Sequence, residues 1–467
     1  MEMAWHVALG IDRASPEPLS EQLVTQLREM VCRGQLAPQV RLPSSRILAE
    51  DLKVSRSVVV EVYERLTAEG LLESVRGSGT RVAAHAGTLL SRPVVLTDRA
   101  VPPARFNMLP GIPRACTFPQ REWLASYQRA VEEAGHQTLG YPPLLGLPDL
   151  RGELVGYLGR MRGVHGTADQ VAVTNGFAQG LSLLCACLRR MGIDKMAVED
   201  PSHDRQRHFI EQNGIRTLPI PVDGQGLDVA RLEASGLRAV MVTPAHQFPR
   251  GMAMSAERRH ALVRWARDNR GVIIEDDYDG GLWIDQRGRH LSLQRLSPGN
   301  VVYAGTASKM LAPGIRLGWL VLPRHMVPVI EAVRARRDLG LDSLLQATFA
   351  DFLRSGQLDR HLRRIRTRNR LMHRTVVEAL DIHLPAAKID NPVAGLHLCL
   401  RLPPGTDEVA LVAGALRRSV LVKGSRVFHH VPAEHHPSLI LGYTALAEPE
   451  VEEAIRRIGE AHRELVA

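Results

Sequence analysis

Hydrophobic spacing in the first 83 residues predicts three short helices followed by a small hairpin. Apolar residues recur at helical spacing in 18–34, in 43–52 and again after Ser55. Residues 71–82, LLESVRGSGTRV, read as two short strands around a glycine turn. The pair Pro43-Ser44 and Ser55 stand where helix starts are favoured. Two helices joined by a tight turn and followed by a hairpin are typical of a winged helix-turn-helix.

The inner faces of these helices can be read from the same spacing. We expect Ile47, Leu48 and Leu52 to form the apolar face of the second helix. In the third helix the expected inner residues are Val58, Val59, Val62, Tyr63 and Leu66.

The pattern changes after this segment. Residues 84–106 lack periodicity and mix small residues with three prolines, which is typical of an extended linker. From residue 107 onward, apolar runs alternate with amphipathic helices such as 255–269. The runs read as buried strands are 170–176, 194–200, 239–245, 271–279, 300–306 and 317–323. We therefore predict an α/β domain over 107–467, with a mostly parallel sheet covered by helices, beside a small α+β domain over 1–83.

Composition limits the classes of protein. The 467 residues are 45% hydrophobic, enough for more than one core, and no run of about 18 apolar residues or signal-like leader occurs. We expect a soluble cytoplasmic protein with no membrane partner. The five scattered cysteines are expected to be reduced core thiols.

Charge does not identify the DNA-binding part. The net charge is +9, but residues 1–85 hold ten Lys/Arg and eleven Asp/Glu. The excess lies later, notably in 359–374, which we interpret as a solvated or subunit-facing helix side rather than a DNA contact.

The start of the third helix suits DNA. Ser55, Arg56 and Ser57 combine helix N-terminal amides, hydroxyls and a guanidinium, which bind phosphates and guanine edges. Residues 16–83 resemble the DNA-binding domain of the GntR family, through LPSSRILAEDLKVSRSVVVEVYERLTAEGLLESVRGSGTRV. The resemblance implies a double-stranded DNA operator as partner. It assigns DNA contacts to Arg46, Ser55, Arg56 and Ser57, and the wing tip to Arg76 and Gly77. The alternative is a helical hairpin used for protein contacts.

Polar residues gather where the predicted strands of the large domain end. They are Asn175, Asp276, Tyr278, Thr306, Ser308 and Lys309. Ligands bind at the carboxyl ends of strands in such sheets. A lysine there can be an ion-pair partner, a phosphate ligand or a Schiff-base former. With Arg316 seven residues on and carboxylates in 275–279, the set fits pyridoxal 5'-phosphate (PLP).

Residues 107–467 resemble the fold-type I aminotransferases, and the whole chain resembles the MocR subfamily of GntR regulators. The matching motifs are LGYPPLLGLPDLRGELVGYLGRMRGV, VTPAHQFPRGMAMSAERR, IIEDDYD and YAGTASKMLAPGIRLGWLV. The resemblance implies that Lys309 forms the Schiff base and that Asp276 meets the pyridine nitrogen, with Glu275 and Asp277 as alternatives. It places Tyr278 and either His246 or Gln247 beside the ring hydroxyl. The implied phosphate ligands are Gly176, Phe177, Ala178, Thr306, Ser308 and Arg316. Tyr141 resembles a tyrosine that reaches the partner subunit's phosphate, which implies a homodimer.

Several positions depart from the family pattern. His203 stands where tyrosine is common, and Arg205 stands where some members bind an effector carboxylate. Ile440 replaces a carboxylate-binding arginine of some relatives, and Gly280-Gly281-Leu282-Trp283 replaces an acidic and aromatic run. The His429-His430 and His435-His436 pairs are interpreted as a surface loop, not a metal site.

The function implied is a transcription regulator whose aminotransferase-like domain senses an amine, an amino acid or PLP itself. The alternative is a PLP-dependent aminotransferase with an appended DNA-binding domain, and a cofactor-free dimerisation scaffold is the third hypothesis. If the chain has enzymatic activity, it is expected to be a vestigial transamination. The sequence leaves open the effector, the operator and target genes, and whether the protein activates or represses.

Overall fold

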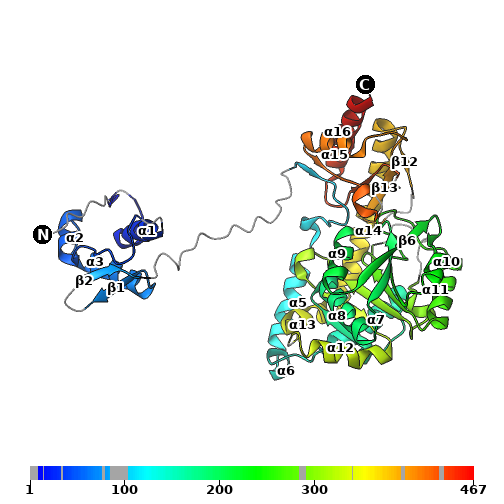
Figure 1. The fold of residues 1–467 in the computed structure, drawn as a ribbon, viewed down its shortest axis with the longest axis horizontal. Helices are drawn as coiled ribbons and strands as arrows, with labels where there is room; N and C mark the ends of the chain where they lie inside the picture. The colour runs from blue at the N-terminus through cyan, green and yellow to red at the C-terminus, as the bar shows by residue number, and fades with distance from the viewer. Residues whose placement is uncertain are drawn as a thin grey trace. The chain divides into compact units, whose positions relative to one another are not determined.

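A computed structural model describes residues 9–13, 15–32, 35–75, 79–84, 104–282, 291–338, 340–390, 395–430 and 436–466. The chain divides into two compact units, residues 1–101 and 102–467 (Figure 1).

The N-terminal unit consists of three helices and a hairpin. Its helices are α1 (Leu19–Cys32), α2 (Ser45–Leu52) and α3 (Arg56–Ala68). Strands β1 (Leu72–Val75) and β2 (Gly79–Val82) pair in antiparallel register. These elements occur in the order predicted for a winged helix-turn-helix.

The tight turn between α2 and α3 depends on backbone geometry at both ends of α2. Ser44 caps the helix start, because its hydroxyl accepts the N–H of Ile47 at 3.3 Å. Lys53 ends the helix in the left-handed region, with φ 52°, and its N–H bonds back to carbonyls of α2. The turn therefore needs only the three residues 53–55 between the helices, and none of them is a glycine.

The inner face of α2 is narrower than predicted. Leu48 is buried and Leu52 is half-buried, whereas Ile47 is 46% exposed, so its assignment to the inner face was wrong. Leu48 and Leu52 are one helical turn apart, while Ile47 is rotated from Leu48 by about 100°. In α3 the predicted stripe is buried, apart from half-buried Val58.

An eight-stranded sheet forms the centre of the C-terminal unit, in the order β4-β11-β10-β9-β8-β5-β6-β7. Strands β6, β5, β8, β9 and β10 pair in parallel, and β11 is antiparallel to both of its neighbours. The bounds are β4 Val171–Thr174, β5 Lys195–Asp200, β6 Arg216–Asp223, β7 Gly226–Leu227, β8 Ala239–Val242, β9 Val272–Asp277, β10 Val301–Thr306 and β11 Gly318–Val321.

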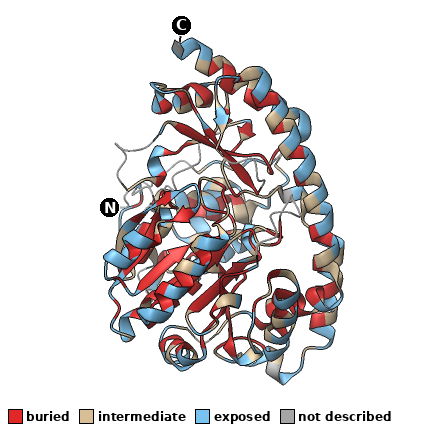
Figure 2. Ribbon diagram, turned by 90° about the vertical axis from the view of Figure 1, so that its right-hand side faces the viewer, coloured by how far each residue is buried: buried red, intermediate tan, exposed pale blue. Residues whose placement is uncertain are grey.

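Helices cover this sheet and shield it from water. In Figure 2 the strands are red along most of their length, whereas the helices carry pale-blue outer faces. The covering helices are α5 (Gln120–Glu132), α6 (His136–Leu139), α7 (Pro148–Arg162), α8 (Gly176–Arg190), α9 (Asp204–Gln212), α10 (Val229–Ala234), α11 (Ala256–Asp268), α12 (Val327–Arg334) and α13 (Ser343–Arg354). The mostly parallel α/β prediction is confirmed. All six predicted strands form.

Strands β6 and β7 were not predicted. Pro219 and Pro221 interrupt the sequence of β6, and proline cannot donate to a strand ladder. β6 tolerates them because it pairs along its length only with β5 and meets β7 only at Val222 and Asp223.

A smaller lobe follows the sheet domain, and we call it the C-terminal lobe. Its antiparallel sheet has the order β12 (Lys388–Ile389), β13 (His397–Arg401), β16 (Ser438–Gly442) and β15 (Lys423–Gly424). Helices α15 (Glu408–Arg417) and α16 (Glu448–Val466) pack with it. Strand β3 (Phe106–Asn107) pairs with β14 (Val420–Leu421), which ties the start of this unit to its end.

The basic segment 359–374 lies in one long helix, α14 (Gln357–His383). Part of its charge is structural, which differs from a solvated face. Arg366 donates to the carbonyl of Gly281 at 2.8 Å, and Arg368 donates to the carbonyl of Leu446 at 2.6 Å. The helix therefore braces both the sheet domain and the C-terminal lobe.

The thiols largely follow the prediction. Cys185, Cys187 and Cys399 are buried and Cys116 is exposed, and these four are free thiols. Within the described part of the chain, every helix is too short or too polar to span a bilayer.

Candidate functional site

A cavity of about 370 Å³ opens where β9 and β10 end. Lys309 lies three residues beyond the end of β10, and its Nζ donates to the backbone carbonyl of Gly111 at 2.6 Å. Burial lowers the pKa of Lys309, and the nearby carboxylates Asp276 and Asp279 oppose that shift. The amine is therefore more nucleophilic than a surface lysine at the same pH.

Alternation along β9 separates its three acids, because successive side chains point to opposite faces. Asp276 lines the cavity. Glu275 accepts the N–H groups of Leu293 and Gln294 at 2.9 and 3.0 Å instead. Asp277 accepts from Arg162 Nε at 2.6 Å, on the far face. Among the three acids, only Asp276 faces Lys309.

Asp276 has an unusual environment for a carboxyl group. Burial raises its pKa to about 7, and a hydrogen bond from Gln206 Nε2 at 2.9 Å acts in the opposite direction. Gln206 was not singled out from the sequence, because its position in α9 carries no motif.

A group of anion-binding donors lies on the other side of the cavity. Helix α8 starts at Gly176, and the next two residues, Phe177 and Ala178, line the cavity. Gly176 has φ +69°, and a Cβ there would lie 2.9 Å from Nη2 of Arg316. Arg316 Nη2 also donates to the carbonyl of Asn175 at 3.2 Å. A helix N-terminus with an adjacent guanidinium favours a phosphate.

Hydroxyl groups complete this donor group. Thr306 Oγ1 and Ser308 Oγ lie 3.0 Å apart, and the N–H of Ser308 donates to Thr306 Oγ1 at 3.1 Å. Both residues line the cavity beside Lys309.

His246 and Phe248 lie beside Tyr278 at the cavity. Tyr278 lines the cavity, and its hydroxyl lies 2.9 Å from His246 Nδ1. Neither His246 nor Gln247 is among the described lining residues; Gln247 Nε2 instead donates to the carbonyl of Pro201 at 2.8 Å. Phe248 occupies the cavity wall in their place.

The outer end of the cavity is cationic and aromatic. His203 and Arg205 line it, as does Lys423, which the sequence reading missed. Lys423 lies directly opposite Ile440 in the β15–β16 register, and its Nζ is 5.4 Å from the centre of the Phe428 ring. A cation thus comes from the strand next to Ile440. Burial lowers the pKa of His203 to about 4, so this ring is neutral at pH 7.

The glycine pair after Tyr278 is explained by packing. A Cβ on Gly280 would lie 2.2 Å from Asp277 Oδ2, and one on Gly281 would lie 2.9 Å from Met310 Sδ. Trp283 lies outside the described residues.

Tyr141, predicted to reach the partner subunit's phosphate, lies on the surface of the single chain. It is 86% exposed and is not among the described lining residues of the cavity.

The predicted DNA-contacting residues lie at one end of the helix pair. Arg46 is exposed and contacts Glu50 at 3.4 Å, and Arg56 Nε lies 3.4 Å from Ser45 Oγ. Ser55 precedes α3 but makes no capping hydrogen bond, and its Oγ lies 2.8 Å from Ser57 Oγ. The side-chain groups are thus available to an outside partner. Arg76 and Gly77 lie outside the described residues.

The histidine pairs lie partly outside the described residues, since His435 is among those not described. Among the described residues, no three His, Cys, Asp or Glu side chains are arranged so that they could hold a metal ion. The backbone N–H of His430 donates to Asp200 Oδ1 at 3.0 Å.

Comparison with known proteins places these two units in known families. Residues 19–82 match "Bacterial regulatory proteins, gntR family", and residues 115–458 match "Aminotransferase class I and II". The chain is 35% identical over 402 residues to the HTH-type pyridoxine biosynthesis transcriptional regulator PdxR of Corynebacterium glutamicum, covering 84% of this chain and 85% of that protein. It is 32% identical to the probable rhizopine catabolism regulatory protein MocR of Rhizobium meliloti, covering 97% and 95%. This chain belongs to the MocR-type transcriptional regulators.

Solved structures agree with this assignment of fold. The MocR-type chain matches a kynurenine aminotransferase of Pyrococcus horikoshii with a TM-score of 0.70 and 25% identity, over 78% of this chain and 91% of that one. The prediction of a fold-type I domain after the helix-turn-helix is confirmed, and the GntR-type domain of the regulator indicates DNA binding.

Proposed function

We propose that this MocR-type regulator binds PLP in the first cavity, senses a carboxylate-bearing amine there, and changes its DNA binding in response. The observation that carries the proposal is the position of Lys309 and Asp276 in one cavity beside an anion-binding donor group. Each of these features matches a different part of the cofactor.

The residues that line the first cavity fit PLP, because each reactive group of the cofactor has a chemically matching side chain or helix end there. When bound, the cofactor supplies an aldehyde that condenses with primary amines and a ring that withdraws electrons. Lys309 is the amine that holds it, and Asp276 is the acid that would hold a protonated ring nitrogen. The start of α8, Ser308 and Arg316 would hold the phosphate. Tyr278, whose pKa burial raises well above its usual value, stays protonated and would donate to the ring oxygen.

The outer end of the cavity supports a carboxylate-bearing effector. Arg205 and Lys423 supply two cations, and the aromatic rings of Phe248 and Phe428 enclose them. Ile440 offers no charge, so Lys423 takes over carboxylate recognition from the neighbouring strand. An amine with a carboxylate can then reach Lys309 with its nitrogen and Lys423 with its acid.

A homodimer is part of the proposal. Apolar residues of α5 and α6 remain exposed in one chain, including Leu124, Val131 and Leu139 at 56%, 46% and 68%. Tyr141 follows the same segment at 86% exposure. A partner subunit would cover these side chains, and Tyr141 would then reach the partner's phosphate. Two helix-turn-helix units would read two operator half-sites.

The first experiment is a cofactor titration followed by visible absorption, on wild type and on Lys309→Ala. A new band in wild type that is absent in the variant supports attachment through Lys309. Equal spectra would refute it. Arg205→Gln is the matched control, because it leaves Lys309 and the anion-binding donors unchanged.

A panel of amines and amino acids added to the loaded protein then separates regulator from enzyme. A stable spectral shift supports a sensor, whereas conversion of the cofactor to its amine form supports transamination. Amines that shift the spectrum should change the affinity for DNA selected from a random-sequence library, and Arg56→Ala should remove that binding. An effector that shifts the spectrum without any change in DNA affinity would contradict the coupling.

A further inference from the structure

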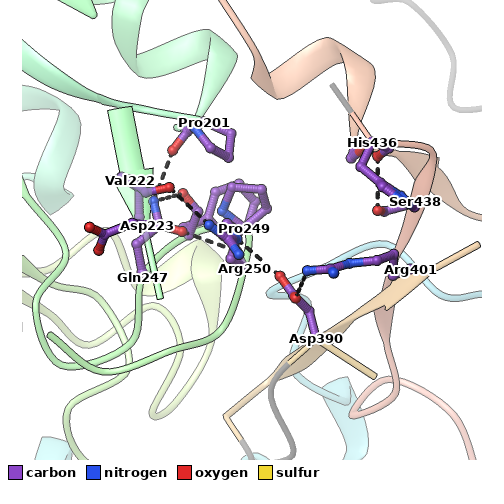
Figure 3. Close-up of polar contacts among 12 residues, drawn as sticks. Pro201, Val222, Asp223, Gln247, Pro249, Arg250, Asp390, Arg401, His436 and Ser438 are labelled. Atoms are coloured by element: carbon purple, nitrogen blue, oxygen red, sulfur yellow. Dashed lines mark hydrogen bonds and ion pairs between the residues drawn. The ribbon is translucent and has the colours of Figure 1, made fainter. Parts of the chain in front are cut away.

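A second cavity, of about 310 Å³, lies between the sheet domain and the C-terminal lobe (Figure 3). On one side it is lined by the ends of β5 and β6 and by the loop that carries Arg250. On the other side it is lined by Asp390, Arg401 and Ser438 of the small sheet. The two cavities share no described lining residue.

Two arginines from different lobes share one carboxylate in this cavity. Arg250 Nε contacts Asp390 Oδ2 at 3.0 Å, and Arg401 Nη2 contacts the other oxygen, Oδ1. Arg250 is held in place by its Nη1, which donates to the carbonyl of Val222 at 2.9 Å. Figure 3 shows the arginines approaching Asp390 from opposite sides.

This cluster carries one more positive charge than negative charge. Arg250 Nη2 and Arg401 Nη1 have no hydrogen-bond partner within the described part of the chain. The other acid of the lining, Asp200, already accepts the N–H of His430 and lies 3.9 Å from His429. Its charge balances the excess of the cluster, so any attraction for an anion comes from the unused N–H groups of the two arginines and not from a net positive charge.

We infer that this second cavity is a binding site for a small anion with a carboxylate or phosphate group, held by Arg250 and Arg401. Guanidinium forks bind such groups through paired hydrogen bonds, and two forks with unused N–H groups face one cavity here. Asp390 keeps the forks in place when no ligand is bound. The inference does not depend on what the first cavity binds.

Two segments, the loop through Arg250 and strand β13, contribute residues to both cavities. Phe248 lines the first cavity, and Arg250, two residues later, lines the second. On β13, His397 lines the first cavity and Cys399 the second. An anion that contacts Arg250 and Arg401 bridges both lobes, so it favours one arrangement of these walls. Any effect on the first cavity must then be reciprocal.

The test is calorimetric titration of the full-length protein with sodium phosphate and, separately, with sodium succinate, at constant ionic strength and with PLP present. We expect saturable binding of at least one probe. Arg401→Gln should weaken it about tenfold or more, because a charge-assisted contact is lost. Arg401→Lys keeps the positive charge but lacks the guanidinium fork, so its affinity for the anion should lie between those of wild type and Arg401→Gln.

Arg354→Gln is the matched control. Its side chain is 50% exposed, against 44% for Arg401, and it pairs with Glu153 away from both cavities. Binding of phosphate alone or succinate alone would assign the ligand class and support the inference.

Absence of saturable binding, or unchanged binding in both Arg401 variants, would overturn it and leave the cluster as a clamp between lobes. An anion that binds at the donors beside Arg316 would still bind to Arg401→Gln, so binding that persists unchanged in this variant contradicts the inference. The PLP absorption band tests the proposed function separately. If Arg401→Gln fails to fold by circular dichroism, Arg401→Lys decides the outcome.

Discussion

Gly176→Ala tests whether the start of α8 and Arg316 act together on a phosphate. Gly176 has φ +69°, and an added Cβ would lie 2.9 Å from Nη2 and 3.0 Å from Cζ of Arg316. Gly192, just beyond the other end of α8, has φ +75° but no atom within 4 Å of an added Cβ. Gly192→Ala therefore introduces the same backbone strain without the collision.

The two variants separate the free-energy cost of backbone strain from the cost of displacing Arg316 from the phosphate. The left-handed conformation costs a non-glycine residue about 1–2 kcal/mol, so both variants should lower the free energy of unfolding by this amount. Only Gly176→Ala displaces the guanidinium of Arg316. Loss of a charge-assisted hydrogen bond to phosphate is worth about 1.5–3 kcal/mol. We therefore expect PLP affinity to fall roughly tenfold to a hundredfold in Gly176→Ala and to stay near wild type in Gly192→Ala.

The assay is a PLP titration followed by absorbance, together with urea unfolding of the cofactor-free proteins. Wild-type PLP affinity in Gly176→Ala would refute the role given to Arg316. An equal loss of PLP affinity in both variants would show that backbone strain at the ends of α8, rather than the position of the Arg316 guanidinium, controls cofactor affinity.

Three further predictions concern other parts of the chain. Burial raises the pKa of Asp276 to about 7, so between about pH 4 and pH 7 the folded, cofactor-free protein binds more protons than the unfolded chain and its stability falls as pH rises. The free energy of unfolding of Asp276→Asn, relative to that of wild type, should therefore rise with pH by up to about 1.4 kcal/mol per pH unit. A difference between the two proteins that does not change with pH would contradict the assigned pKa. Ser44→Ala should lower the stability of the N-terminal unit by about 1 kcal/mol in thermal unfolding, because it removes a cap. Ser55→Ala removes no capping bond, so it should weaken DNA binding with little loss of stability, and equal thermal shifts would refute this distinction. Lys423→Met should weaken a carboxylate-bearing effector about tenfold in spectral titrations and leave PLP affinity unchanged, while Lys423→Arg should restore part of the loss; unchanged effector affinity in Lys423→Met would remove Lys423 from the effector site.

The sequence pattern was sufficient to predict an element or a site residue where its neighbours in sequence decide its structure. The helix-turn-helix follows from the caps and apolar spacing of 43–66, because these contacts lie within a few residues of one another. The strands before Asp276 and Lys309 follow from continuous apolar runs, and the motifs around them placed both residues at strand ends. Strand β6 was not predicted because its prolines are tolerated only where one side of the strand is largely without a partner strand.

Tertiary structure decided the contacts that join distant segments. The spacing of Glu275, Asp276 and Asp277 shows that they alternate, but only the fold shows which face meets Lys309. That Phe248 lines the cavity while His246 contacts Tyr278 depends on how the loop after β8 meets the C-terminal lobe. Lys423 enters the first cavity because β15 pairs with β16, and Arg250 meets Arg401 because two lobes close on Asp390. Sequence alone thus determined the two kinds of fold and most of their elements, and it singled out Lys309 as the residue proposed to hold the cofactor, since these depend on short-range periodicity and motif. The walls of both cavities depend on long-range pairing, for which the energy comes from burial across the whole fold.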